Sequence, residues 1–123
     1  MSNIKAATKF VPVAKVSDLK PGTMKSFVVE NRHILLAMVA DKYYAADNKC
    51  PHMGADLSLG RLEGSVLTCP RHGSQFDLTD GKVLRWTSWT GFVARASQLL
   101  RSPRPLAVYP VKVEGDNILV GIP

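Results

Sequence analysis

The chain has 123 residues, of which 46% are hydrophobic, and a formal net charge of +6 at pH 7. This length predicts a single domain, 1–123, with enough apolar residues for a buried core. No apolar run is long enough for a membrane span, and the first 16 residues lack the pattern of a secretory signal, so we expect neither. The lysines and arginines are spread along the chain without an arginine-rich run, which argues against nucleic-acid binding. They form either a solvated basic surface or one that attracts an acidic redox partner.

Before residue 47, short stretches with strand-like composition are separated by polar turns, and the first of them, Phe10–Val16, alternates apolar and polar residues. This pattern is typical of β-strands in an antiparallel, all-β domain. The strands predicted here are Phe10–Val16, Met24–Glu30, His33–Val39 and Tyr43–Ala46. His33 lies within the third of them, away from the other histidines, and we interpret it as a strand residue rather than a metal ligand.

The segment 47–77 contains both cysteines and two of the three histidines of the chain. They form two short pairs, Cys50-x-His52 and Cys69-x-x-His72, each beside a proline and a glycine that favour tight loops. Soft thiolates and imidazoles offered by two loops predict a metal site. A tetrahedral zinc ion with two Cys and two His ligands is one alternative. Zinc ligand pairs usually place like ligands together, whereas each loop here supplies one of each kind, which favours a cluster of two irons.

The rest of the chain also reads mainly as strands. Residues 57–64 are glycine-rich and predicted to be irregular, and residues 79–82 carry a hairpin signal. The last two strands are expected to pair with each other and return to the first sheet. The predicted strands are Ser65–Thr68, Gln75–Leu78, Ala107–Glu114 and Asn117–Ile122.

Residues 86–102 break the strand pattern and predict one inserted amphipathic helix. A serine or threonine can cap its start, and Pro103 ends it. The apolar face either covers the β-sheet base or docks on a partner or a membrane surface, with Trp86 and Trp89 as anchors. The residues of that face are Trp89, Phe92, Val93, Ala96, Leu99 and Leu100.

The two mixed pairs and the residues around them resemble the Rieske iron–sulfur proteins. The motifs that carry this resemblance are His52-Met53-Gly54-Ala55, Gly60-Arg61-Leu62-Glu63-Gly64, Cys69-Pro70-Arg71-His72-Gly73 and Phe76-Asp77. The resemblance implies an antiparallel β sandwich or barrel base with a small cluster-binding subdomain, 47–77. It also implies one Rieske-type 2Fe-2S cluster per chain, with both thiolates on one iron and both imidazoles on the other. The implied ligands are Cys50, His52, Cys69 and His72.

Four further residues are expected to surround the cluster: Gly54, Gly73, Ser74 and Phe76. In high-potential members of the family, a serine and a tyrosine donate hydrogen bonds to sulfur. Ser74 matches the serine, although it can equally be a plain turn residue, and Phe76 replaces the tyrosine. The resemblance therefore implies a potential in the lower half of the Rieske range of about −150 to +300 mV. Respiratory members add a loop disulfide at the positions of Ala55 and Arg71, which points here to a soluble Rieske-type ferredoxin.

The function implied is that of a one-electron carrier between a reductase and an oxygenase or another redox acceptor, not that of an enzyme. A Rieske oxygenase needs a second site with two His and a carboxylate, and only His33 is left over. The alternative is a small subunit of a nitrite-reductase-like complex or another non-carrier redox subunit. With both cysteines assigned to the metal, none remains for a disulfide, which suits a reducing cytoplasm. The sequence does not indicate an oligomeric state.

Overall fold

The structure is a computed structural model that describes residues 9–51, 54–71, 73–85 and 104–123. Nearly all of its regular elements are short strands, and the two helical turns, η1 and η2, are single 3₁₀ turns. In chain order the elements are β1 (Lys9–Lys15), η1 (Val16–Asp18), β2 (Met24–Val29), β3 (Arg32–Val39), β4 (Lys42–Asp47), η2 (Leu57–Leu59), β5 (Arg61–Glu63), β6 (Val66–Thr68), β7 (Gln75–Asp77), β8 (Val83–Arg85), β9 (Val108–Tyr109), β10 (Val111–Glu114) and β11 (Asn117–Ile122).

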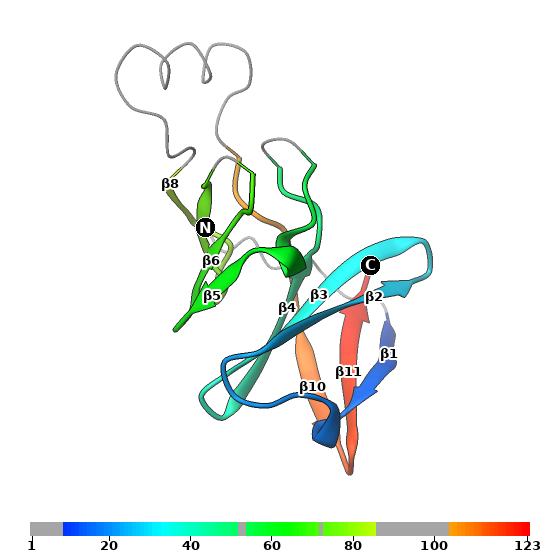
Figure 1. Ribbon diagram of the computed structural model, residues 1–123. Helices are drawn as coiled ribbons and strands as arrows, with labels where there is room; N and C mark the ends of the chain where they lie inside the picture. The colour runs from blue at the N-terminus through cyan, green and yellow to red at the C-terminus, as the bar shows by residue number, and fades with distance from the viewer. Residues whose placement is uncertain (1–8, 52–53, 72, 86–103) are drawn as a thin grey trace, which may run out of the picture.

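The strands form three antiparallel sheets (Figure 1). One has the order β1-β11-β10, the second β2-β3-β4-β9, and the third β5-β6-β7-β8. The first two make the base of the molecule, and the third lies to one side of it. The predicted all-β, antiparallel fold is confirmed. The last two strands do pair with each other, and they join β1 rather than the β2–β4 meander.

Strand β3 is buried on both faces because it lies between two hydrophobic cores. Side chains of successive strand residues point to opposite faces. Ile34 and Leu36 belong to the base core, which they share with Ile118 and Val120 of β11. Leu35 and Ala37 belong to a second core, the loop-side core. That core also contains Cys50, Ala55, Leu57, Leu67, Cys69, Phe76, Leu78, Leu106 and Val108.

The strand bounds agree with the predicted ones to within a residue or two, with three exceptions, of which one is β8, a strand that the sequence analysis did not predict. The prediction of one strand over Ala107–Glu114 is wrong, because Pro110 divides it into β9 and β10. Proline has no N–H for a sheet ladder, and the chain uses this break to change sheets: β9 pairs with β4 and β10 with β11. The segment expected to be irregular, 57–64, contains η2 and β5.

The predicted helix over 86–102 lies outside the described residues and stays a prediction. Within the part of the chain that the structure describes, no helix is long and apolar enough to cross a membrane.

Candidate metal centre

Each cysteine lies near the start of a loop that follows a strand, β4 of the second sheet for one and β6 of the third sheet for the other. Cys50 follows β4 and is 2% exposed, and Cys69 follows β6 and is 3% exposed. Both belong to the loop-side core, together with Leu57 and Phe76. They are not joined in a disulfide. The two thiols that the sequence predicts as metal ligands are therefore gathered in one buried region.

The first loop, residues 48–57, is closed by backbone hydrogen bonds at its base. The N–H of Cys50 donates to the carbonyl of Ala55 at 2.8 Å, and the N–H of Gly54 donates to the carbonyl of Cys50 at 2.8 Å. Gly54 has a φ of +73°, a left-handed conformation that glycine adopts at little cost. The predicted ligand His52 lies outside the described residues. The loop positions the Cys50 sulfur through the backbone on either side of His52.

The second loop, residues 69–74, closes in the same way. The N–H of Cys69 donates to the carbonyl of Ser74 at 2.7 Å, so each cysteine bonds to the residue five positions later. Gly73 has a φ of +72°, which matches Gly54 of the first loop. His72, the predicted ligand of this loop, lies outside the described residues. The side chain of Arg85 adds a bond from outside the loop, since its Nε donates to the carbonyl of Gly73 at 3.0 Å.

Ser74 and Phe76 are fully buried where the second loop returns to the third sheet. Phe76 of β7 stands opposite Leu67 of β6 and Val83 of β8, in the loop-side core that also contains Cys69. Complete burial of a serine hydroxyl is costly unless the hydroxyl is hydrogen-bonded. A serine that served only as a surface turn residue would not need to be buried. The burial of both side chains supports the expectation that they lie close to the metal.

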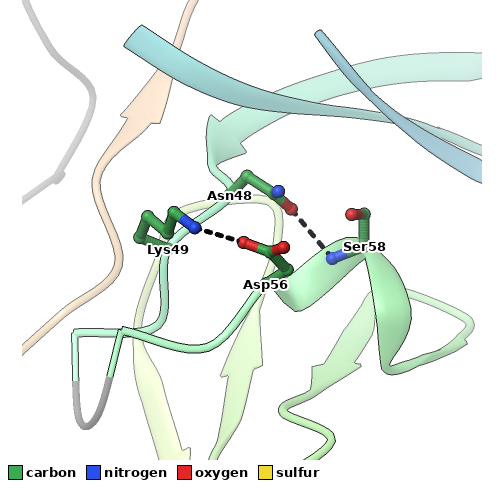
Figure 2. A network of polar contacts seen from close by, with 4 residues as sticks. All are labelled: Asn48, Lys49, Asp56 and Ser58. Carbon is green, nitrogen blue, oxygen red and sulfur yellow. Dashed lines mark hydrogen bonds and ion pairs between the residues drawn. The ribbon is translucent and has the colours of Figure 1, made fainter. Parts of the chain in front are cut away.

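An ion pair closes the base of the first loop on its outer side. Lys49 and Asp56 form an isolated β-bridge, and the Lys49 Nζ lies 2.5 Å from Asp56 Oδ1 (Figure 2). The hydrogen bond from Lys49 holds the pKa of Asp56 below its usual value. Both side chains are about half exposed, so water and salt screen the pair and its contribution to stability is small. The side chain of Asp56 is thus paired with Lys49.

The surface beside the cysteine loops is basic. Arg71 of the second loop, Arg85 at the end of β8, and Arg104 are exposed, and we call these three residues the basic rim. Arg104 also lines a hollow of about 390 Å³, together with Lys49, Cys50 and Pro51. Among the described residues, the ion pairs are formed by Lys9, Lys49, Arg61 and Lys112, and none of them involves an arginine of the basic rim.

The donors that the described residues offer suit a thiolate-bound metal. Within the described ranges no three His, Cys, Asp or Glu side chains come together, and both predicted histidine ligands lie outside them. What the structure does contain is two buried thiols on two loops of matching closure, a donor set that selects zinc or iron–sulfur clusters over magnesium or calcium. The described residues therefore fit the predicted cluster.

Two features of the site escaped sequence reasoning. Asn48 is buried at the base of the first loop, and Arg85 reaches the second loop from β8. A polar residue two positions before a cysteine carries no spacing signal. Arg85 lies 12 residues beyond Gly73 in sequence, and only the antiparallel pairing of β7 with β8 brings them together.

Comparison with known proteins adds independent findings. The sequence model of the Rieske [2Fe-2S] domain matches residues 9–117. The ferredoxin component of the naphthalene 1,2-dioxygenase system of Pseudomonas putida is 31% identical over 114 residues, which cover 93% of this chain and 96% of the relative. The solved ferredoxin of carbazole 1,9a-dioxygenase from Nocardioides aromaticivorans IC177 is 29% identical, with a TM-score of 0.75 over 93% of this chain and 98% of the other. A chain in a solved complex of reduced oxygenase and oxidized ferredoxin in carbazole 1,9a-dioxygenase is 28% identical, with a TM-score of 0.72 over 91% and 92% of the two chains.

Proposed function

Because the chain belongs to the Rieske [2Fe-2S] domain family, we propose that its single cluster is held by four side chains: Cys50, His52, Cys69 and His72. The observation that supports this ligand set is the pair of buried cysteines on loops with the same hydrogen-bonded closure. The ligand spacing makes 47–77 the cluster-binding part of one Rieske domain, 1–123. When bound, a Rieske cluster accepts and releases one electron at a time.

Like the ferredoxin components to which it is similar, the protein is a one-electron carrier and not itself an enzyme. By analogy with these relatives, it passes electrons from a reductase to a terminal oxygenase. The complex of oxygenase and ferredoxin in a related system supports an oxygenase as the acceptor. Buried cysteines that must stay reduced to bind iron support a cytoplasmic location.

The ligand set is tested on the purified protein. It should be reddish-brown and, once reduced, show the electron paramagnetic resonance (EPR) signal of a Rieske centre. Replacement of any of the four ligands, for example Cys69→Ser or His72→Asn, should abolish that signal, because metal binding and folding of the loops are coupled. His33→Asn is the matched control and should keep it, since His33 lies in β3. A colourless protein with one equivalent of zinc would refute the proposal.

The carrier role has its own test. Coulometric titration should deliver one electron per chain, and the reduced protein should be reoxidised by the terminal oxygenase of the same host. Uptake of one electron without reoxidation by that oxygenase would instead favour another acceptor.

The acceptor is proposed to carry an acidic surface. The basic rim of Arg71, Arg85 and Arg104 surrounds the loops that are proposed to hold the cluster. Complementary charge speeds encounter and orients the two proteins. Charge on this rim therefore favours an encounter in which the loops face the acceptor, which shortens the path for the electron.

A further inference from the structure

Asn48 is one of two buried polar side chains among the described residues, the other being Ser74. It is 4% exposed and lies two residues before Cys50. Burial of an amide side chain is unfavourable unless its polar atoms find hydrogen-bond partners. The partners of Asn48 therefore show what this position contributes to the first loop.

Asn48 connects three segments through three hydrogen bonds. Its N–H donates to the carbonyl of His33 in β3 at 2.8 Å, and its carbonyl accepts from the N–H of Leu57 at 2.7 Å. Its side-chain Oδ1 accepts from the N–H of Ser58 at 2.8 Å (Figure 2). Leu57 and Ser58 belong to η2, which follows the first loop. Asn48 thus ties both ends of the loop to each other and to the central sheet.

The side chain of Asn48 caps the N-terminus of η2. The first N–H groups of a helical turn need acceptors from outside it. Asp56 occupies the cap position of η2, yet its side chain makes no capping bond and pairs with Lys49 instead. Oδ1 of Asn48 takes over this role from across the loop. The contact that starts η2 is therefore also the contact that closes the loop.

We propose that Asn48 is a positioning residue for the metal centre: it fixes the base of the first loop, from which the proposed ligand Cys50 is presented. This inference rests on the proposed ligand set. Of the side-chain contacts at the base of the loop, the Lys49–Asp56 pair is exposed and screened, whereas the Asn48 side chain is buried and its bond to Ser58 is partly buried. Loss of Oδ1 leaves the Ser58 N–H without its acceptor and removes the side-chain bond between the two ends of the loop, so that only backbone bonds and the exposed ion pair hold them together.

The test compares Asn48→Leu with Asn48→Asp in the cluster-loaded protein. Leucine keeps the size of the side chain and removes the acceptor, whereas aspartate keeps an acceptor for the Ser58 N–H at the start of η2. We expect Asn48→Leu to release iron to a ferrous chelator about tenfold faster or more, with a shifted or broadened EPR signal. Asn48→Asp should stay close to the wild type. Asn117→Leu is the matched control, since the side chain of Asn117 accepts a bond from Lys15 on a sheet without metal loops, and it should release iron at the wild-type rate.

A folded Asn48→Leu protein with the iron release rate and EPR signal of the wild type would overturn the proposal. If that variant does not fold, amide hydrogen exchange of the wild type decides. The N–H groups of Leu57 and Ser58 should then be protected, and exchange as fast as that of an exposed turn such as Gly115 would equally overturn it. A wild type that lacks a Rieske EPR signal would refute the ligand set instead, and the exchange of Ser58 would still report on Asn48.

Discussion

Phe76 occupies a position where a single hydroxyl group would change the environment of the metal. It is fully buried in the loop-side core with Cys50 and Cys69, and it follows Ser74, which is also fully buried. Hydrogen bonds to sulfur stabilise the reduced cluster, which carries one more negative charge, over the oxidised one. A phenylalanine at this position offers no such bond.

Phe76→Tyr is therefore expected to raise the reduction potential by on the order of tens of millivolts, since a bond to a charged group is worth about 1.5–3 kcal/mol and only part of it differs between redox states. Ser74→Ala should lower the potential by a similar amount. Protein-film voltammetry measures both shifts. Phe27→Tyr, a partly buried position of the base core, is the control and should leave the potential unchanged. A lower potential in Phe76→Tyr would contradict the role assigned to this position.

The candidate metal ligands could be predicted from the sequence, whereas the residues that hold their loops in place could not. Cys50 and Cys69 stand out because mixed Cys and His pairs are rare in a short chain, and both are buried as ligands should be. Ser74 stood out only through the family pattern. The role of Asn48 could not be predicted, because it depends on hydrogen bonds to η2 and β3 that form only in the folded protein.

At the scale of elements, the junction between η2 and β5 is built on a close backbone approach at Gly60. A Cβ at Gly60 would lie 2.0 Å from the carbonyl oxygen of Thr68, the residue before Cys69, and 3.1 Å from Pro70. A side chain at this position must therefore push β6 and the start of the second loop away.

Gly60→Ala is expected to destabilise the protein by about 1–3 kcal/mol or more, the usual range for overpacking, and to reduce its iron content. Gly64→Ala is the control: its φ of +60° makes an alanine strained by about 1–2 kcal/mol, but nothing lies within 4 Å of the new Cβ. It should lose stability and keep the iron. Denaturant unfolding and iron analysis measure the two effects, and a Gly60→Ala protein with full iron content would contradict this account.

A second element-scale contact links the end of β4 to β9. The hydroxyl of Tyr109 donates to the carboxylate of Asp47, and burial together with that neighbouring carboxylate raises the pKa of Tyr109 to about 12. The folded state therefore favours the neutral phenol. Its contribution is fully present below the unfolded pKa of about 10 and is lost as the pH rises through the folded value of about 12.

The free energy of unfolding should accordingly fall between pH 10 and 12, by on the order of 2 kcal/mol from this group. In Tyr109→Phe that part of the fall should disappear, while the stability below pH 10 should already be lower because the bond to Asp47 is lost. Urea unfolding at several pH values measures both. Equal slopes in the two proteins would show that the phenol does not stay neutral in the folded state.

Element types followed from the sequence because short apolar runs bounded by polar turns mark the strands of the base, as in Asn117–Ile122, whose bounds agree with the prediction. The sheet order did not follow, since strands distant in sequence pair: β1 with β11, and β9 with β4. Pro110 indicated a break in the predicted strand, because proline interrupts the hydrogen-bond ladder of a β-sheet. The three-residue strand β5 is too short for its alternation to be recognised.

At the scale of the whole molecule, the two ends differ in role. The cysteine loops lie at one end, and η1 lies at the opposite end of the base (Figure 1). The proposal that part of the net charge of +6 serves partner docking rests on exposed arginines from three separate segments. Arg85 contacts the second loop directly, and Arg104 lines a hollow with the first.

The salt dependence of the rate of electron transfer to the acceptor should therefore come from the basic rim and not from charges elsewhere on the surface. Interfaces between transient redox partners generally bury less than about 1,200 Å², and ions screen charges over about 10 Å at 0.1 M salt, so rim charges act mainly on the association rate. Stopped-flow oxidation of the reduced protein by its acceptor should slow as ionic strength rises. Arg71→Gln and Arg104→Gln should slow the reaction at low salt and flatten its salt dependence, because each removes a charge that guides the encounter.

Lys20→Gln is the matched control, since Lys20 is exposed in the turn that follows η1, the element at the far end of the base (Figure 1). It removes the same unit of net charge, and the wild-type salt dependence should remain. If all three variants changed the rate equally, total charge rather than the rim would govern the encounter. If the wild-type rate did not respond to salt at all, the basic rim would serve hydration and not docking, and the acceptor would not need an acidic surface.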